Sequence, residues 1–262
     1  MFARRVVVAV ALAAAGLILA TPMAAAADPL PSPPAVTMDE QDCLETSVAR
    51  AVLTSKIDPL VPDRYALANL NANASRFIVT TYTCSQVSVE GQPVAGHDKP
   101  TTVTIGTAPV ISRDGEQFPS QEQYIIWYGT DNPVLFAKLQ QTGLPVSFLP
   151  RSSTTITSDN GITTVDWAIR GAELNYDERA VWTEQTTELV TPTTTWWHDG
   201  PKGDLRITYD NRFMRSTAVL TADFTDNDLL SDLIAQPTLL NINQVPFPFV
   251  RGSWSSQVSF VS

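Results

Sequence analysis

Segments rich in valine, isoleucine, threonine and aromatic residues, separated by short polar turns, fill the chain from Arg76 onward. These residue types suit a pleated, half-buried surface, so the pattern predicts β-strands. The clearest turn is Asp159-Asn160-Gly161, because Asn-Gly accepts the positive φ of a tight hairpin turn. The expected strands are residues 77–89, 101–112, 123–129, 146–157, 162–170, 174–180, 187–198, 204–209, 214–224 and 250–261.

A helical pattern is expected in the segment before these strands, over residues 37–56. Thr37 can cap this helix with Glu40 three residues on, and acidic side chains favour its positive end. Its buried stripe recurs at helical spacing and consists of Leu44, Val48, Ala51 and Val52.

Two shorter helices interrupt the strands. The first begins at Asp131 or Asn132, has Pro133 in its first turn and ends at Gly143. The second covers residues 227–235, with a leucine-rich stripe and a proline two residues beyond its end.

These elements predict a mainly β (α+β) protein. About ten strands with two or three packing helices favour a single curved antiparallel β-barrel. Composition does not change and no internal repeat appears, so we expect one domain over residues 37–262, with an N-terminal helix.

The first 27 residues have the pattern of a secretory signal peptide. Arg4 and Arg5 precede an apolar run over residues 6–20, and small residues lead up to Ala27. We expect cleavage after Ala27 and a proline-rich tether over residues 28–36. The sequence therefore predicts a secreted or extracytoplasmic protein, of bacterial type, with no stable membrane insertion after cleavage.

The charge balance excludes some partners. The formal net charge is -10, and it becomes about -12 when the two arginines of the leader are removed. Nucleic acids and anionic lipids need clustered basic residues, so nucleic-acid binding is not expected. Oligomeric state is not determined by these features.

The two cysteines, Cys43 and Cys84, allow a single pairing. In an oxidising compartment we expect them to form a disulfide that fixes the N-terminal helix to the domain, the alternative being two buried free thiols.

Few residues suit catalysis. His198 lies beside Asp199 and could serve as a general base, although aromatic residues at a strand end more often close a core. Neither a metal site nor a cofactor motif is expected. The aromatic residues are the stronger signal, because inward-facing rings in a large barrel line ligand cavities. The candidate ligand-binding residues are Trp127, Tyr128, Trp196 and Trp197.

The segment YIIWYGTDNPVLFAK, residues 124–138, reads as a strand followed by a helix, and another strand follows near Gly143-Leu144-Pro145. With the meandering strands and late helix, this order resembles the acetoacetate decarboxylase-like β-barrel superfamily over residues 61–262. The resemblance implies a barrel around a cavity and an enzyme whose Schiff-base lysine has an adjacent lysine. This chain has no adjacent lysine pair; Lys138 is the nearest candidate by position.

We therefore expect a small-molecule-binding or scaffold protein of the cell envelope or exterior, whose cavity holds a small apolar ligand. The enzymatic alternatives are an acetoacetate decarboxylase-like lyase or a degenerate relative of one, and a hydrolase centred on His198. Whether the chain is an enzyme stays open at this point.

Overall fold

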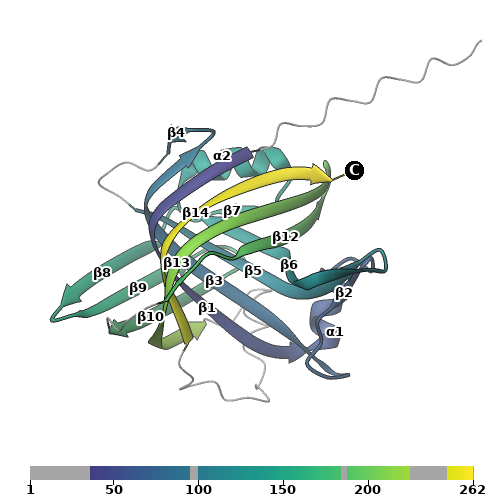
Figure 1. Ribbon diagram of the computed structural model, residues 1–262, viewed down its shortest axis with the longest axis horizontal. Helices are drawn as coiled ribbons and strands as arrows, with labels where there is room; N and C mark the ends of the chain where they lie inside the picture. The colour runs from purple at the N-terminus through teal and green to yellow at the C-terminus, as the bar shows by residue number, and fades with distance from the viewer. Residues whose placement is uncertain (1–35, 95–99, 184–187, 225–246, 262) are drawn as a thin grey trace, which may run out of the picture. The chain divides into compact units, whose positions relative to one another are not determined.

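The computed structural model describes residues 36–94, 100–183, 188–224 and 247–261, which build one large β-sheet with short helices (Figure 1). The mainly β class is confirmed. No helix in these residues is long and apolar enough to cross a bilayer. The elements are β1 Val36–Leu53, α1 Thr54–Ile57, a 3-10 turn Asp58–Leu60, β2 Tyr65–Leu67, β3 Ala74–Val89, β4 Gln92–Pro93, β5 Thr101–Arg113, β6 Glu116–Thr130, α2 Pro133–Thr142, β7 Val146–Phe148, β8 Ser153–Asp159, β9 Ile162–Arg170, β10 Asn175–Thr183, β11 Glu188–Val190, β12 Thr193–Gly200, β13 Gly203–Phe224 and β14 Phe247–Val261.

Strand β12 hydrogen-bonds to two strands that stand far apart in the sheet order. The order runs β12-β6-β5-β3-β1-β14-β13, and β12 also pairs with β13, so the pairings return to their start. We call these seven strands the strand ring. Strand β12 lies parallel to β6, whereas the other neighbours in the ring are antiparallel.

Strand β13 extends beyond the ring and carries a second layer. Its last part pairs with β10, and β9 and β8 follow. Side chains of β9 and β10, including Trp167 and Tyr176, pack with Phe77 and Val79 of β3 in one apolar cluster, which we call the outer cluster. A second cluster, the interior cluster, consists of ring residues such as Met38 together with Leu135 and Leu139 of α2. Because strand side chains alternate, the two faces of the ring strands belong to different clusters.

The predicted helix over residues 37–56 is wrong, because this segment is strand β1 followed by the four-residue α1. Leu44, Val48 and Val52 are four residues apart, a spacing that places side chains on one face of a helix and of a strand alike. Over residues 36–40 the burial alternates strictly, which only a strand produces.

Two locally encoded elements are confirmed. Helix α2 begins after Asn132, whose side chain accepts hydrogen bonds from the backbone N–H groups of Val134 and Leu135, and it ends at Gly143 with φ 95°. The hairpin between β8 and β9 turns at Asn160 and Gly161, both with positive φ.

Strand boundaries differ in three places. The predicted strand 146–157 is divided into β7 and β8, and 187–198 into β11 and β12, whereas 204–209 and 214–224 are one strand, β13. The predicted helix over residues 227–235 lies outside the described residues.

The expected disulfide joins Cys43 of β1 to Cys84 of β3, which face each other in the antiparallel register. Both cysteines are fully buried. The bridge therefore fixes two neighbouring ring strands rather than a helix, which corrects that part of the prediction.

Replacing both cysteines with alanine should lower the melting temperature by roughly 10 °C, since closing a loop of this length contributes about 4 kcal/mol in the chain-entropy model. Calorimetry of the oxidised protein and of Cys43→Ala/Cys84→Ala measures the difference. Equal melting temperatures would contradict a stabilising bridge.

Candidate functional site

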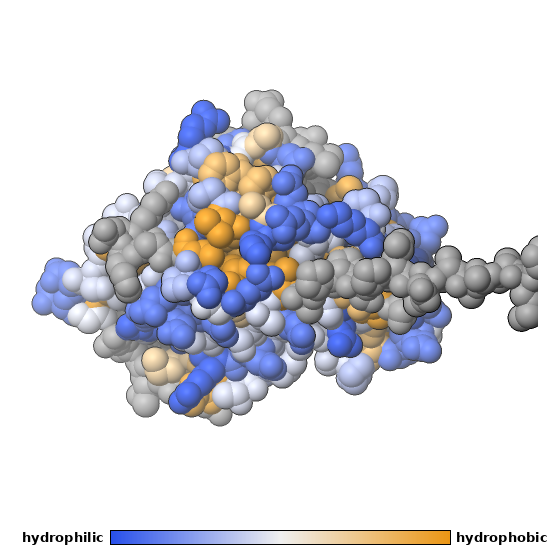
Figure 2. Space-filling model, turned by 90° about the horizontal axis from the view of Figure 1, so that it is seen from above, coloured by the Kyte–Doolittle hydropathy of each residue, from blue (hydrophilic) through white to orange (hydrophobic). Residues whose placement is uncertain are grey.

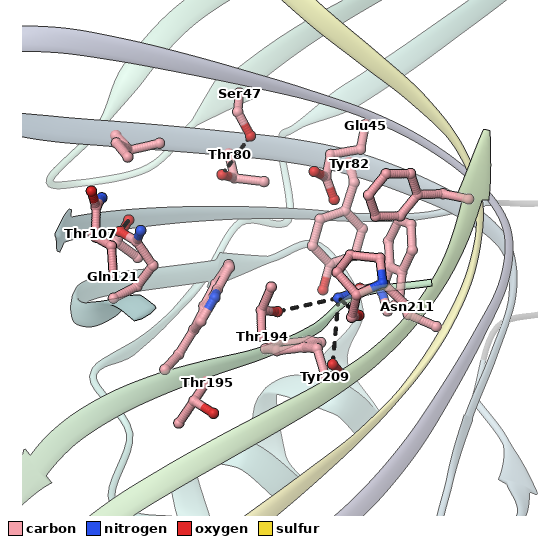
Figure 3. A pocket seen from close by; sticks show the side chains of 16 residues that line it. Glu45, Ser47, Thr80, Tyr82, Thr107, Gln121, Thr194, Thr195, Tyr209 and Asn211 are labelled. Carbon is pink, nitrogen blue, oxygen red and sulfur yellow. Dashed lines mark hydrogen bonds between the residues drawn. The ribbon is translucent and has the colours of Figure 1, made fainter. Parts of the chain in front are cut away.

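A cavity of about 440 Å³ lies among the strands of the ring (Figure 3). Every strand of the ring contributes to its lining, so the cavity is on the inner side of the closed pairing. One residue from each strand illustrates this: Glu45 of β1, Tyr82 of β3, Thr107 of β5, Gln123 of β6, Trp196 of β12, Tyr209 of β13 and Trp254 of β14.

A bulge in β1 turns two of its four acidic side chains, Glu40 and Glu45, toward the same interior. The register shifts between Glu40 and Cys43, where Asp42 has a positive φ of 50°. An extra residue in one strand normally reverses the facing of all later side chains. Here Glu40 before the bulge and Glu45 after it therefore both face inward, as the burial of Cys43 in the interior cluster also indicates.

Glu40 and Glu45 lie among buried tyrosines, and we call Glu40, Glu45, Tyr82, Tyr128 and Tyr209 the acid–tyrosine cluster. Tyr82 donates a hydrogen bond from its hydroxyl to Glu40 Oε1 at 2.9 Å and lies 3.3 Å from the hydroxyl of Tyr128. Among the described residues, Glu40 Oε2 and the hydroxyl of Tyr209 have no hydrogen-bond partner. The cluster is thus incompletely satisfied.

Burial makes ionisation of these groups costly. It raises the pKa of Glu40 to about 7, against the hydrogen bond from Tyr82, which lowers it. Burial, with the neighbouring Glu40 carboxyl as a smaller cause, raises the pKa of Glu45 to about 8. Burial also raises the pKa of Tyr82 and of Tyr209, so both stay neutral hydroxyls at ordinary pH.

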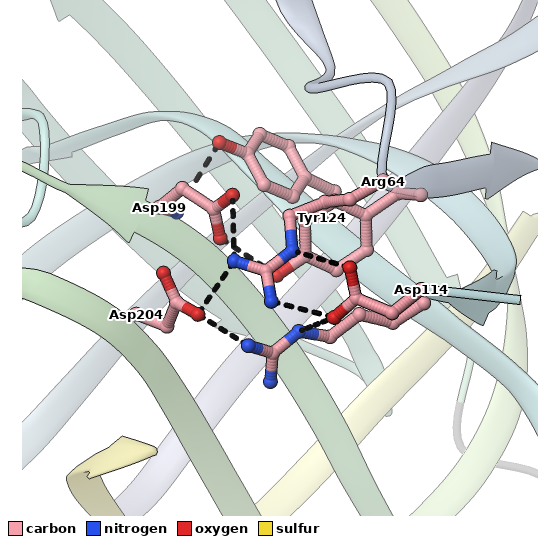
Figure 4. Close-up of polar contacts among 7 residues, drawn as sticks. Arg64, Asp114, Tyr124, Asp199 and Asp204 are labelled. Atoms are coloured by element: carbon pink, nitrogen blue, oxygen red, sulfur yellow. Dashed lines mark hydrogen bonds and ion pairs between the residues drawn. The ribbon is translucent and has the colours of Figure 1, made fainter. Parts of the chain in front are cut away.

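A second cluster of polar side chains, centred on Arg64, lies outside the cavity and connects three loops (Figure 4). Arg64 donates to both oxygens of Asp114, at 3.2 and 2.6 Å, and to Asp204 at 2.6 Å. Arg113 pairs with Asp204 as well. These contacts connect the segment before β2 to the β5–β6 and β12–β13 hairpins, which is a structural role.

The structure places His198 and Asp199 in different surroundings. His198 Nδ1 lies 3.0 Å from the carbonyl oxygen of Ile125, and burial lowers the pKa of His198. Asp199 accepts a hydrogen bond from the Tyr65 hydroxyl at 2.8 Å and lies 3.7 Å from Arg64. Asp199 is therefore held in the polar group around Arg64, and neither residue lines the cavity.

The four aromatic residues predicted to bind a ligand lie in different parts of the structure, and only one of them lines the cavity. Trp196 lines the cavity, with its ring 4.9 Å from that of Tyr209. Tyr128 lies in the acid–tyrosine cluster, beside the cavity. Trp197 points to the opposite face of β12 and stacks on Phe118, and Trp127 packs in the outer cluster.

Lys138 lies on α2 and pairs with Glu90 at 2.7 Å, with more than a third of its side chain exposed. It does not line the cavity, and neither do Lys56 and Lys202, while Lys99 lies outside the described residues. Within the part of the chain that the structure describes, no group of three histidine, cysteine or acidic side chains is placed to bind a metal.

The acidic part of this site is not predicted from the sequence. The pattern there places Glu40 in a helix cap and gives no sign of Glu45, Tyr82 or Tyr209. The alternation of residues 36–40 could have indicated it. Glu40 follows Val36 and Met38 at the inward-facing positions of the strand, where an apolar residue is normal. Such a buried acid is rare unless it is paired or functional.

The mainly β fold of this chain is similar to solved structures of acetoacetate decarboxylase and related enzymes, at low sequence identity. No family model matches the sequence, and no curated protein matches it at significant similarity. Solved structures do share its fold. Acetoacetate decarboxylase from Legionella pneumophila superposes with a TM-score of 0.56 at 8% identity, over 85% of this chain and 84% of that chain.

The enduracididine biosynthesis enzyme MppR, solved with pyruvate, superposes with a TM-score of 0.52 at 11% identity, over 88% of this chain and 91% of that chain. The structure with HEPES buffer gives 0.53 at 12% identity, over 87% and 86%. The resemblance predicted from residues 124–138 is confirmed for the fold. Sequence identities this low are evidence for a shared fold but not for a shared reaction.

Glu40→Gln should stabilise the protein at pH 8 by up to about 3 kcal/mol and leave it nearly unchanged at pH 4.5. The folded-state pKa lies above the unfolded value of 4.5, so the stability due to this carboxyl is fully present below 4.5 and is lost as pH rises through about 7. Urea unfolding at both pH values measures this, and Asp159→Asn, at an exposed position of β8, controls for net charge. A difference between wild type and Glu40→Gln that does not change with pH would refute the assignment.

Proposed function

We propose that this chain is an exported binding protein for a small molecule, built as a β-barrel whose interior is the binding site. The single observation that carries this is the cavity of about 440 Å³ lined from all seven strands of the ring. A volume of this size is ordinary for small-molecule sites. Its aromatic rings would contact the apolar part of a ligand, and its hydroxyl and amide groups would orient it.

Export is supported by the sequence and agrees with the cross-strand bridge. The basic, apolar and small-residue succession of residues 1–27 is the pattern of a cleavable leader. A buried Cys43–Cys84 disulfide suits an oxidising compartment. The proposed location is outside the cytoplasm, in the cell envelope or beyond.

The fold likeness alone would favour a lyase, but the cavity lacks the group that such chemistry needs. A Schiff base requires an amine in contact with the substrate, and no lysine is found among the described lining residues. The pyruvate bound by MppR is an anion. The described lining of this cavity contains no arginine, lysine or histidine, so it offers no basic side chain to pair with a carboxylate.

The hydrolase alternative has less support than binding. His198 is oriented toward a backbone carbonyl, and Asp199 is bound to Tyr65 and Arg64. The two residues therefore do not form an acid–base pair next to the cavity.

Binding is tested with N-phenyl-1-naphthylamine, a neutral fluorescent probe that is smaller than the cavity. The probe should bind with one-to-one stoichiometry and quench tryptophan emission, since Trp196 and Trp254 line the cavity. Ser47→Trp places a large ring in the lining and should weaken binding at least about tenfold. Thr37→Trp, at an exposed position of the same strand, is the matched control. Equal affinities of the two variants, or no saturable binding by the wild type, would overturn the proposal.

The absence of Schiff-base chemistry is tested by borohydride trapping. Incubation with acetoacetate and sodium borohydride should leave the intact mass of the protein unchanged, because Lys138 is engaged with Glu90 outside the cavity. A reduced adduct located on Lys138 by peptide mapping would restore the lyase alternative.

A further inference from the structure

The ionisable side chains of the cavity can become negative but not positive. Among the described residues that line it, Glu45 is the only acidic side chain, and lysine, arginine and histidine are absent. The second carboxyl, that of Glu40, lies close enough to raise the pKa of Glu45. A ligand with a carboxylate or phosphate would meet repulsion from an ionised Glu45, whereas a cation would meet a carboxyl that no described residue pairs with.

Aromatic rings surround the same space. Trp196 and Tyr209 lie with ring centres 4.9 Å apart, and Tyr82 and Trp254 meet edge to face at 5.1 Å. Phe213 of β13 adds a further ring to the lining. The negative faces of such rings attract cations, most strongly where water is excluded, and a cage of several rings is a common way to bind an ammonium group.

Hydrogen-bonding capacity in the cavity also remains unused. Tyr209 is only 4% exposed and lines the cavity, yet its hydroxyl has no hydrogen-bond partner among the described residues. No described residue donates a hydrogen bond to Glu45. Leaving the buried hydroxyl of Tyr209 unpaired costs free energy, which a ligand with an N–H donor would recover, and the partly buried Glu45 offers a second acceptor. Figure 3 shows Glu45, Tyr82 and Tyr209 within this one space.

We propose that the cavity binds an organic cation, a small ammonium compound with an apolar body. The ammonium group lies against Glu45 and donates to it, with the rings of Trp196 and Tyr209 beside it. The apolar body fills the rest of the aromatic lining. This inference rests on the proposed binding function and specifies the chemical class of its ligand.

The test compares three probes of similar size that differ in charge: phenethylammonium, 2-phenylethanol and 3-phenylpropionate. Isothermal titration at pH 8 should give at least about tenfold tighter binding of phenethylammonium than of 2-phenylethanol, with 3-phenylpropionate weakest. Glu45→Gln should remove that preference by weakening the ammonium probe about tenfold while leaving 2-phenylethanol unchanged. Asp39→Asn removes an exposed carboxylate from the same strand and should change neither affinity.

A second readout follows from proton exchange. Glu45 lies near enough to the carboxyl of Glu40 and to the neutral hydroxyl of Tyr209 to interact with both electrostatically, and the nearby Tyr82 and Tyr128 are neutral as well. An arriving ammonium favours the ionised form of Glu45, so binding should release a proton, and affinity should increase as pH rises toward about 8. Titration in two buffers of different ionisation enthalpy measures the proton count.

The outcomes separate the two proposals. Equal binding of the ammonium and the alcohol, unaffected by Glu45→Gln, overturns the cation assignment and leaves the binding function intact. Failure of these three probes and of N-phenyl-1-naphthylamine to bind overturns both. Trp196→Leu gives an independent variant should Glu45→Gln not fold, and it should weaken the ammonium probe more than the alcohol.

Discussion

The hydrogen bonds of β12 to both β6 and β13 are the constraint on which the rest of the structure depends. Without the parallel contact of Trp196 and Trp197 with β6, the ring strands would form an open sheet with two faces. With it, one face becomes an interior that every ring strand shares. Alternation along each strand then assigns its side chains either to that interior or to the layer of β8, β9 and β10.

That division also separates the acids of the interior from the basic side chains of the surface. The interior of the ring holds Glu40 and Glu45, and no cation is found near them in the described residues. The basic side chains that compensate acids, such as Arg64 and Arg113, lie instead at the hairpins outside the cavity. Uncompensated burial of carboxyls costs stability at neutral pH, which proteins tolerate chiefly at functional sites.

Local chemistry made part of this structure predictable. The Asn132 cap, the glycine at the end of α2 and the Asn160-Gly161 turn are each decided by a few neighbouring residues, and the structure has all three. The pairing of Cys43 with Cys84 followed from the number of cysteines alone.

Other features depended on tertiary contacts that the sequence does not display. A spacing of four residues fits a helix and a strand equally, so β1 was assigned to the wrong element. Trp196 and Trp197 are adjacent and chemically alike, and only the register of β12 decides which one lines the cavity. Glu45 and Tyr209 approach each other through the closure of the ring, which no local pattern reveals.

The most direct measurement is a crystal structure of residues 28–262 without added ligand. We expect β12 to pair with β6 as well as with β13, and a space of about 440 Å³ bounded by Glu45, Trp196 and Tyr209 to hold solvent or a retained small molecule. A structure in which β12 leaves β6 and the sheet stays open, or in which side chains fill the interior, would contradict it.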